Sequence, residues 1–159
     1  MAATSSPALQ PNERTVDITR VFDAPRKLLW KAWTDPEHMA QWWGPQGFTN
    51  PVCELDARPG GALKIVMRAS DGTEYPMRGV FREVLESRRL VFTAVAEDEH
   101  GNPLLESLTT VSFAEEGGKT KLTVHAHAVG LAPVAPRMLE GMQIGWTQSL
   151  QRLEAHIRC

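Results

Sequence analysis

The residues whose types and spacing best suit metal chemistry are two histidines, His125 and His127. Residues two apart on a strand point to the same face, so both imidazoles could reach one ion. Spacing supplies no third ligand, although Glu54, Asp56 or Glu106 could approach in the folded chain. Because a structural zinc ion takes four ligands, we interpret the two histidines as solvent-facing residues and predict no metal site.

No motif for covalent catalysis or cofactor binding is present in the sequence. It contains no nucleophile elbow, no phosphate-cradling glycine loop and no cysteine pair at zinc spacing. General acid–base catalysis would need a histidine or carboxylate of shifted pKa inside a cavity. Glu74 and Glu106 are the acidic residues to inspect for that role. We predict no catalytic residue and no cofactor, and we leave an enzymatic activity open.

The binding of an apolar molecule is the chemistry that the large side chains favour. Methionines and indoles suit an apolar pocket of adaptable shape, and Tyr75 or Trp146 could donate a hydrogen bond to a ligand carbonyl. Hydroxyl groups share one face of a strand at Ser107 and Thr109. The candidate ligand-binding residues are Trp42, Trp43, Phe48, Leu63, Ile65, Met67, Tyr75, Met77, Ser107, Thr109, Met142 and Trp146. The alternative is that the large side chains simply fill a core.

A long helix over residues 133–157 must position several of these candidates. Apolar and small residues recur there at steps of three and four, the pattern of one buried helix face. They are Leu139, Met142, Trp146, Ser149, Leu150, Leu153 and Ile157. Such a helix would be roughly 36 Å long at ~1.5 Å per residue, which spans a small domain.

Before that helix the sequence predicts strands, interrupted once by two short helices. The helices start near Arg26 and Pro36, each after a stop or cap, and the second ends at residues 44–45. Period-two alternation predicts strands at 15–22, 52–57, 63–68, 75–84, 89–96, 105–113 and 119–129. Strands followed by one helix indicate an α+β fold, with a curved antiparallel sheet of about six to seven strands around the helix.

Bulk properties limit the domain count and the classes of partner. At 159 residues the chain is long enough for one domain, which we place at 14–159 after a disordered leader at 1–13. The net charge of -2 excludes the basic excess of nucleic-acid-binding proteins, and no apolar run is long enough to cross a membrane. Two cysteines make no disulfide framework, so we expect a cytoplasmic protein.

A series of short motifs adds a family resemblance over residues 15–157. In order they are VFDAP at 21–25, WTDPE at 33–37, WWGP at 42–45, PGG at 59–61, DGTEY at 71–75, GVFREV at 79–84 and GW at 145–146. Together they resemble bacterial proteins similar to the C-terminal domain of the activator of heat-shock protein 90 ATPase. These proteins belong to the START-like, birch-pollen-allergen-like (SRPBCC) superfamily. The resemblance implies the helix-grip fold, with an internal cavity between the sheet and the C-terminal helix.

What the resemblance implies about function divides into three hypotheses. We predict the binding of a small hydrophobic ligand in the cavity, the commonest role in the superfamily. The alternatives are a small cyclase-like or hydrolase-like enzyme, and a co-chaperone-like module acting on heat-shock protein 90 in a stress response. An enclosed apolar pocket would favour the first, a buried titratable group facing it the second, and an exposed apolar patch with little cavity the third. Monomer and homodimer both remain open.

Overall fold

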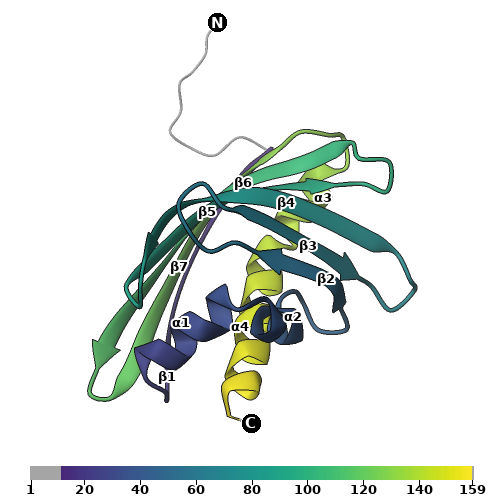
Figure 1. The fold of residues 1–159 in the computed structure, drawn as a ribbon. Helices are drawn as coiled ribbons and strands as arrows, with labels where there is room; N and C mark the ends of the chain where they lie inside the picture. The colour runs from purple at the N-terminus through teal and green to yellow at the C-terminus, as the bar shows by residue number, and fades with distance from the viewer. Residues whose placement is uncertain (1–11, 159) are drawn as a thin grey trace, which may run out of the picture.

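Residues 12–158 are described by the computed structural model, and they form a seven-stranded sheet that curves around a C-terminal helix (Figure 1). The elements are β1 (Glu13–Phe22), α1 (Arg26–Thr34), α2 (Pro36–Trp42), β2 (Thr49–Leu55), β3 (Ala62–Arg68), β4 (Glu74–Leu85), β5 (Arg89–Glu97), β6 (Pro103–Glu116), β7 (Lys119–Gly130), α3 (Ala135–Glu140) and α4 (Met142–Ile157). The strand order is β1-β7-β6-β5-β4-β3-β2, and all neighbours are antiparallel. The predicted α+β helix-grip fold is confirmed.

Alternation along each strand decides which face of the sheet turns toward α4. In β1, Val16 and Phe22 are fully buried, whereas Asp17 between them is exposed. In β7, Val124 is fully buried and the following His125 is exposed. Successive side chains of a strand point to opposite faces, so these buried apolar residues lie on the concave face. The convex face carries the polar set.

One end of the concave face is filled by α1 and α2. Asp35 separates these helices, and its carboxylate accepts a 2.9 Å hydrogen bond from the amide of Glu37 in the first turn of α2. Trp33 and Trp42, one from each helix, are fully buried with ring centroids 4.7 Å apart. The two predicted short helices therefore form a solid aromatic core at this end of the molecule.

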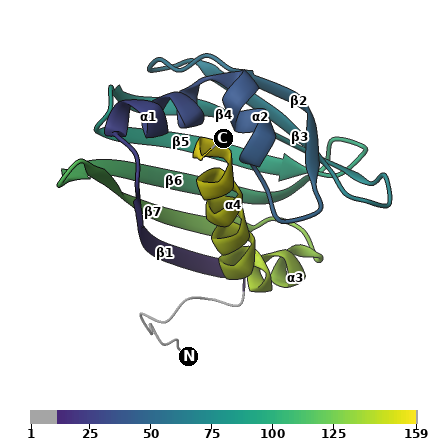
Figure 2. The ribbon, with the colours of Figure 1, turned by 90° about the horizontal axis from the view of Figure 1, so that it is seen from below.

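The C-terminal helix differs from the single element predicted at 133–157. It is divided into α3 and α4 at Gly141, whose backbone has φ −84° and ψ −2°. Glycine destabilises a helix interior because it carries the largest backbone entropy, which makes residue 141 a weak point. Figure 2 shows α4 across the concave face and α3 beside β1 and β7. Leu139 of α3 is buried, and α3 contacts both β1 and β7.

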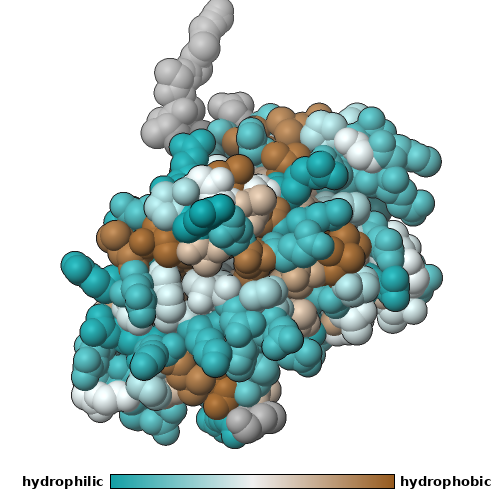
Figure 3. Space-filling model, viewed as in Figure 1, coloured by the Kyte–Doolittle hydropathy of each residue, from teal (hydrophilic) through white to brown (hydrophobic). Residues whose placement is uncertain are grey.

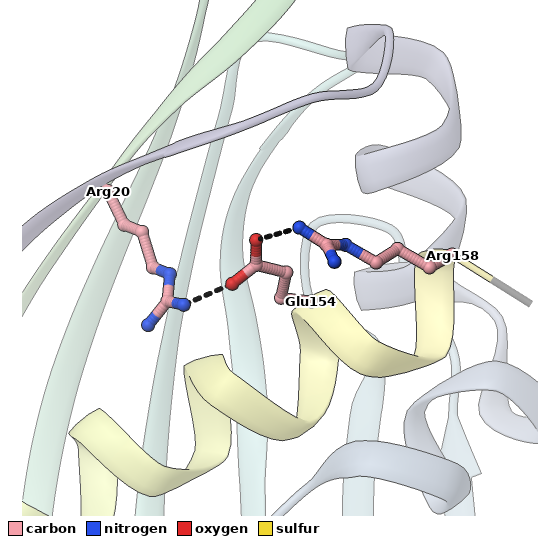
Figure 4. A network of polar contacts seen from close by, with 3 residues as sticks. All are labelled: Arg20, Glu154 and Arg158. Carbon is pink, nitrogen blue, oxygen red and sulfur yellow. Dashed lines mark hydrogen bonds and ion pairs between the residues drawn. The ribbon is translucent and has the colours of Figure 1, made fainter.

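A charged cluster fastens the far end of α4 to β1, as Figure 4 shows. Glu154 accepts a hydrogen bond from Arg20 of β1 through one oxygen, and one from Arg158 at 3.0 Å through the other. The hydrogen bond from Arg20, followed by the positive charges of both arginines, holds the pKa of Glu154 below its usual value. The first strand and the last helix are thereby joined.

Of the predicted leader at 1–13, residues 1–11 lie outside the described residues. Glu13 already belongs to β1, where it pairs with Val129 of β7. The backbone oxygen of Asn12 accepts a hydrogen bond from the amide of Gly130 at 2.6 Å. Pairing with the full length of β7 thus extends β1 two residues beyond its predicted start at Thr15.

Candidate ligand-binding cavity

A cavity of about 230 Å³ lies between the concave face of the sheet and the α3–α4 segment. It extends along the concave face from the loop that follows α2 to α3. Its lining comprises Trp43, Gly44, Pro45, Met67, Met77, Phe92, Ala94, Ala96, Leu105, Ser107, Thr109, Ala126, Ala128, Met138, Gly141, Met142, Gly145, Trp146 and Ser149. This volume lies below the roughly 300–1,000 Å³ of most ligand pockets, but the mainly apolar lining with a few polar groups is typical of a small-molecule site.

The floor of the cavity results from a change in side-chain size along β6 and β7, which β5 follows one residue pair later. Toward α1 the concave face of β7 carries Leu122 and Val124, and beyond them it carries Ala126 and Ala128. The same large-to-small change occurs in the two neighbouring strands. In β6 it runs from Phe113 and Val111 to Thr109 and Ser107, and in β5 from Leu90 and Phe92 to Ala94 and Ala96.

Strand register aligns these small residues side by side. Ser107 pairs with Ala94 on one side and with Ala128 on the other, and Thr109 pairs with Ala126. A void in a closely packed interior needs missing side-chain atoms, and three adjacent strands omit them at the same level. The floor of the cavity is therefore built into the sheet.

Aromatic rings and methionines form the opposite wall. The rings of Trp43 and Trp146 meet edge to face with centroids 5.5 Å apart, and Trp43 also lies 6.4 Å from Phe92. Trp146 stacks against the buried Trp33 at 6.2 Å, which fixes it to the core. Met67, Met77, Met138 and Met142 complete the wall. Methionine side chains are unbranched and flexible, so this wall can adapt to different ligand shapes.

Three hydroxyl groups are the polar side chains of the lining. That of Ser149 donates a 3.0 Å hydrogen bond to the backbone oxygen of Gly145, one turn earlier in α4. Ser107 and Thr109 make no such bond within residues 12–158, although Thr109 is only 2% exposed. Their hydroxyl groups are therefore available to a molecule inside the cavity.

No titratable side chain lines the cavity within the described part of the chain. Glu74 pairs with Arg68 at 2.6 Å, and Glu106 is exposed on the convex face. Burial, aided by Asp35 and Glu54, raises the pKa of the Cys53 thiol to about 11. A thiol of that pKa stays protonated at neutral pH and is a poor nucleophile. The acidic residues singled out from the sequence are thus outside the cavity.

Arg152 of α4 holds the edge of the cavity next to α2. Its Nη1 donates hydrogen bonds to the backbone oxygens of Trp43, Gly44 and Pro45 at 3.0, 2.9 and 2.9 Å. Burial lowers the pKa of this guanidinium. One turn earlier, the side-chain oxygen of Gln148 accepts a 3.0 Å hydrogen bond from the amide of Gln46. We call residues 43–46 the rim segment.

Gly44 of the rim segment is constrained by its backbone and by its neighbour. Its φ is +95°, a region that L-residues rarely adopt. A Cβ at this position would also lie 2.9 Å from Sδ of Met67, so any side chain would push into the wall. Only glycine fits the turn from α2 into the rim.

Seven of the twelve candidate residues line the cavity: Trp43, Met67, Met77, Ser107, Thr109, Met142 and Trp146. The other five lie elsewhere. Trp42, Leu63 and Ile65 are buried in the core, and the Trp42 indole donates a 3.0 Å hydrogen bond to the backbone oxygen of Ala32. Phe48 and Tyr75 pair with each other at 6.0 Å, outside the lining. Alternation along a strand shows which face a residue occupies but not how far the residue lies from the cavity. Contact of the twelve residues with a ligand stays a prediction.

The alanines of the floor were missed as site residues, together with Phe92, Leu105, Met138 and Ser149. A usable signal was present, because β5, β6 and β7 each change from large to small residues on one face. Reading it requires the register between strands, which the sequence alone does not provide.

His125 and His127 lie on the convex face, opposite to Val124, as the parity of β7 predicted. His125 Nδ1 contacts a carboxylate oxygen of Asp17, and His127 Nδ1 lies 2.9 Å from the hydroxyl of Thr15. Residues 12–158 contain no group of three or more His, Cys, Asp or Glu placed to hold one metal ion. Both histidines instead pair with β1, the neighbouring strand.

Comparison with solved structures agrees with this description of the fold. A protein of Chromobacterium violaceum is 30% identical with a TM-score of 0.79, over 94% of this chain and 99% of its own. A protein of Nitrosomonas europaea is 25% identical with a TM-score of 0.74, over 91% and 94% of the two chains. An AHSA1 protein of Silicibacter pomeroyi is 25% identical with a TM-score of 0.75, over 91% and 97%.

Sequence comparison supplies the family. No match was found among curated proteins. Across the described residues, no helix is both long enough and apolar enough to cross a membrane. The family model described as "Activator of Hsp90 ATPase homolog 1-like protein" matches residues 23–158, which is most of the chain. The chain therefore belongs to the family of activator of Hsp90 ATPase homologue 1-like proteins.

Proposed function

We propose that this protein binds a small hydrophobic molecule in the cavity between the sheet and α4. The observation that carries the proposal is the change to small residues in β5, β6 and β7. Filling such a space with leucine or valine would stabilise the core, since each buried methylene contributes about 0.8 kcal/mol. The small residues of β5, β6 and β7 leave this space unfilled beneath aromatic rings and methionines. An unfilled apolar space of this kind suits a ligand site.

Binding without chemical conversion is the form of this function that the lining supports. Acid–base catalysis requires a titratable group within hydrogen-bond reach of the reacting atoms. The described cavity lining offers hydroxyls, thioethers and indoles, and the nearest guanidinium, that of Arg152, is engaged by three backbone oxygens. We therefore favour a carrier or sensor of the molecule over a cyclase or hydrolase.

A chaperone partner is the second candidate, because the family description names an activator of the Hsp90 ATPase. Val80 and Leu108, 43% and 42% exposed, flank Thr93 on the convex face of the sheet. Figure 3 shows hydrophobic residues in separate patches among hydrophilic ones on the face that it presents. A pull-down with heat-shock protein 90, repeated with Leu108→Glu, tests this candidate. Retention that the substitution abolishes would favour it.

We propose a cytoplasmic location for this binding role. The support is the half-buried free thiol of Cys53, which suits a reducing compartment. Fractionation of the producing cells, with detection of the protein in each fraction, would test the location.

Native mass spectrometry of the protein purified from its own host tests the main proposal. We expect a discrete mass addition at near-unit stoichiometry, and denaturing analysis should then release an apolar compound. The addition should disappear in Ala126→Leu, which fills the floor, and should persist in Ala114→Leu, an exposed alanine of β6. An empty wild-type protein that also fails to take up added apolar compounds would contradict the proposal.

A further inference from the structure

The two free hydroxyls of the floor give the cavity a defined polar point. Ser107 and Thr109 are two apart on β6, so both point into the cavity from one strand. Ala94 and Ala128 flank Ser107, and Phe92 and Ala126 flank Thr109. None of these neighbours can accept or donate a hydrogen bond through its side chain. A ligand oxygen placed here could therefore form a hydrogen bond with either hydroxyl group.

The ligand atom at this point must be uncharged. Neither arginine, lysine nor histidine lines the cavity within the described residues, so a carboxylate at the floor would lack a counter-charge. The Nη1 of Arg152 already donates to three backbone oxygens of the rim segment, and its guanidinium is not part of the lining. Burying an unpaired charge in an apolar site is strongly unfavourable. Hydroxyl and carbonyl oxygens remain, and either can pair with a serine or threonine hydroxyl.

The volume limits the size of the ligand. An engineered apolar cavity of about 150 Å³ holds benzene, with six non-hydrogen atoms. By the same ratio a cavity of about 230 Å³ holds roughly nine or ten such atoms. Trp43, Trp146 and Phe92 contribute aromatic rings to the lining, which favours a ligand that contains a ring system.

We infer that the cavity selects an uncharged ring compound of roughly ten non-hydrogen atoms carrying one hydroxyl or carbonyl oxygen, which Ser107 and Thr109 bind. This inference rests on the proposed function and adds the class of ligand. Ser107 and Thr109 are then the residues that determine specificity, whereas the rings and methionines supply affinity for any apolar molecule of this size.

Three related probes test the inference by isothermal titration calorimetry at neutral pH. They are naphthalene, 2-naphthol, which adds an uncharged hydroxyl, and 2-naphthoate, which adds a carboxylate. With the wild-type protein we expect 2-naphthol to bind about tenfold more tightly than naphthalene, the gain of one or two net hydrogen bonds. We expect 2-naphthoate to bind more weakly than naphthalene.

The variant Ser107→Ala/Thr109→Val should remove the preference for 2-naphthol over naphthalene. Thr109→Ser, which keeps the hydroxyl, is the matched control and should retain the preference. If naphthalene binds but 2-naphthol gains nothing, or if 2-naphthoate binds as tightly as 2-naphthol, the inference is overturned while the binding function stands. Should none of the three probes bind, the proposed function itself fails for ligands of this size. The comparison of probes on the wild-type protein decides the question even if the double variant does not fold.

Discussion

At the scale of single residues, Ala126 occupies the middle of the cavity floor, next to Thr109 of β6. Leucine at this position adds three carbon atoms that would extend into empty space. We predict that Ala126→Leu lowers naphthalene affinity by roughly a hundredfold or more, which corresponds to about 3 kcal/mol. The free energy of unfolding should change by less than ~1.5 kcal/mol, because the added carbons displace no packed atoms.

Calorimetry and urea unfolding measure the two effects of Ala126→Leu separately. Ala114→Leu makes the same chemical change at an exposed position and should alter neither quantity. A variant that binds naphthalene with wild-type affinity would mean that the cavity is not the binding site.

A histidine pair links α2 to α4 on the other side of the molecule. His38 Nδ1 lies 2.9 Å from His156 Nε2, and the rings meet edge to face at 5.1 Å. One imidazole must donate and the other accept, which requires at least one unprotonated nitrogen. Burial, followed by the neighbouring His38, lowers the pKa of His156 below its usual 6.5.

This lowered pKa predicts a pH dependence of stability. The unfolded chain takes up the proton first as pH falls, so the stabilisation is present above pH 6.5 and is lost as pH falls through the folded pKa. Thermal melts between pH 7.5 and 5 should show the melting temperature falling less steeply in His156→Gln than in the wild-type protein. His100→Gln, in an exposed turn, is the control and should follow the wild type. Identical slopes in all three proteins would disprove a contribution from His156.

At the scale of elements, most boundaries follow from local sequence. Period-two alternation predicted a strand at 63–68, and β3 spans Ala62–Arg68. Asp35 and Pro36 marked the start of α2 through their cap and first-turn preferences. The break at Gly141 was not predicted, because Leu139 and Met142 are three residues apart and keep the helical period across it. The alanines of the floor were not predicted as cavity residues for a related reason. A small apolar residue keeps the period-two pattern of a strand, although it leaves more space above the sheet than a large one.

The side chain of Arg152 joins α4 to the rim segment by hydrogen bonds to backbone oxygens of that segment. We predict that Arg152→Met destabilises the protein by about 2 kcal/mol, since several charge-assisted hydrogen bonds are lost and backbone oxygens remain uncompensated. Arg152→Lys should recover only part of this, because an ammonium lacks the planar fork of a guanidinium. Amide hydrogen exchange at residues 44–48 should accelerate in both variants.

Arg158→Met is the matched control for the Arg152 prediction, because Arg158 directly follows α4 but makes a single, largely exposed ion pair with Glu154. Its effect on residues 44–48 should be negligible. Unchanged exchange in Arg152→Met would show that Gln148 and local packing suffice to hold the rim.

At the scale of the whole molecule, the Arg20–Glu154 contact connects the first strand to the last helix. We predict that Glu154→Gln lowers the free energy of unfolding by about 1 kcal/mol, the upper end for a partly exposed ion pair. The loss should shrink at high salt, where the charges are screened. Urea unfolding of Arg20→Gln, Glu154→Gln and the double variant measures the coupling between the two side chains. Strictly additive losses would mean that no interaction joins β1 to α4 at this point.

The manner in which Arg152 holds the rim segment has a consequence for protein engineering. The guanidinium contacts carbonyl oxygens, which every amino acid supplies, and it contacts no side chain of the rim. Gly44 is fixed by its φ and its close approach to Met67, and Trp43 by its packing on Phe92 and Trp146, whereas Pro45 has no such constraint on its side chain. Libraries randomised at Pro45 should thus yield many folded members with altered ligand preference, because Arg152 binds the backbone of the rim segment whatever side chain it carries.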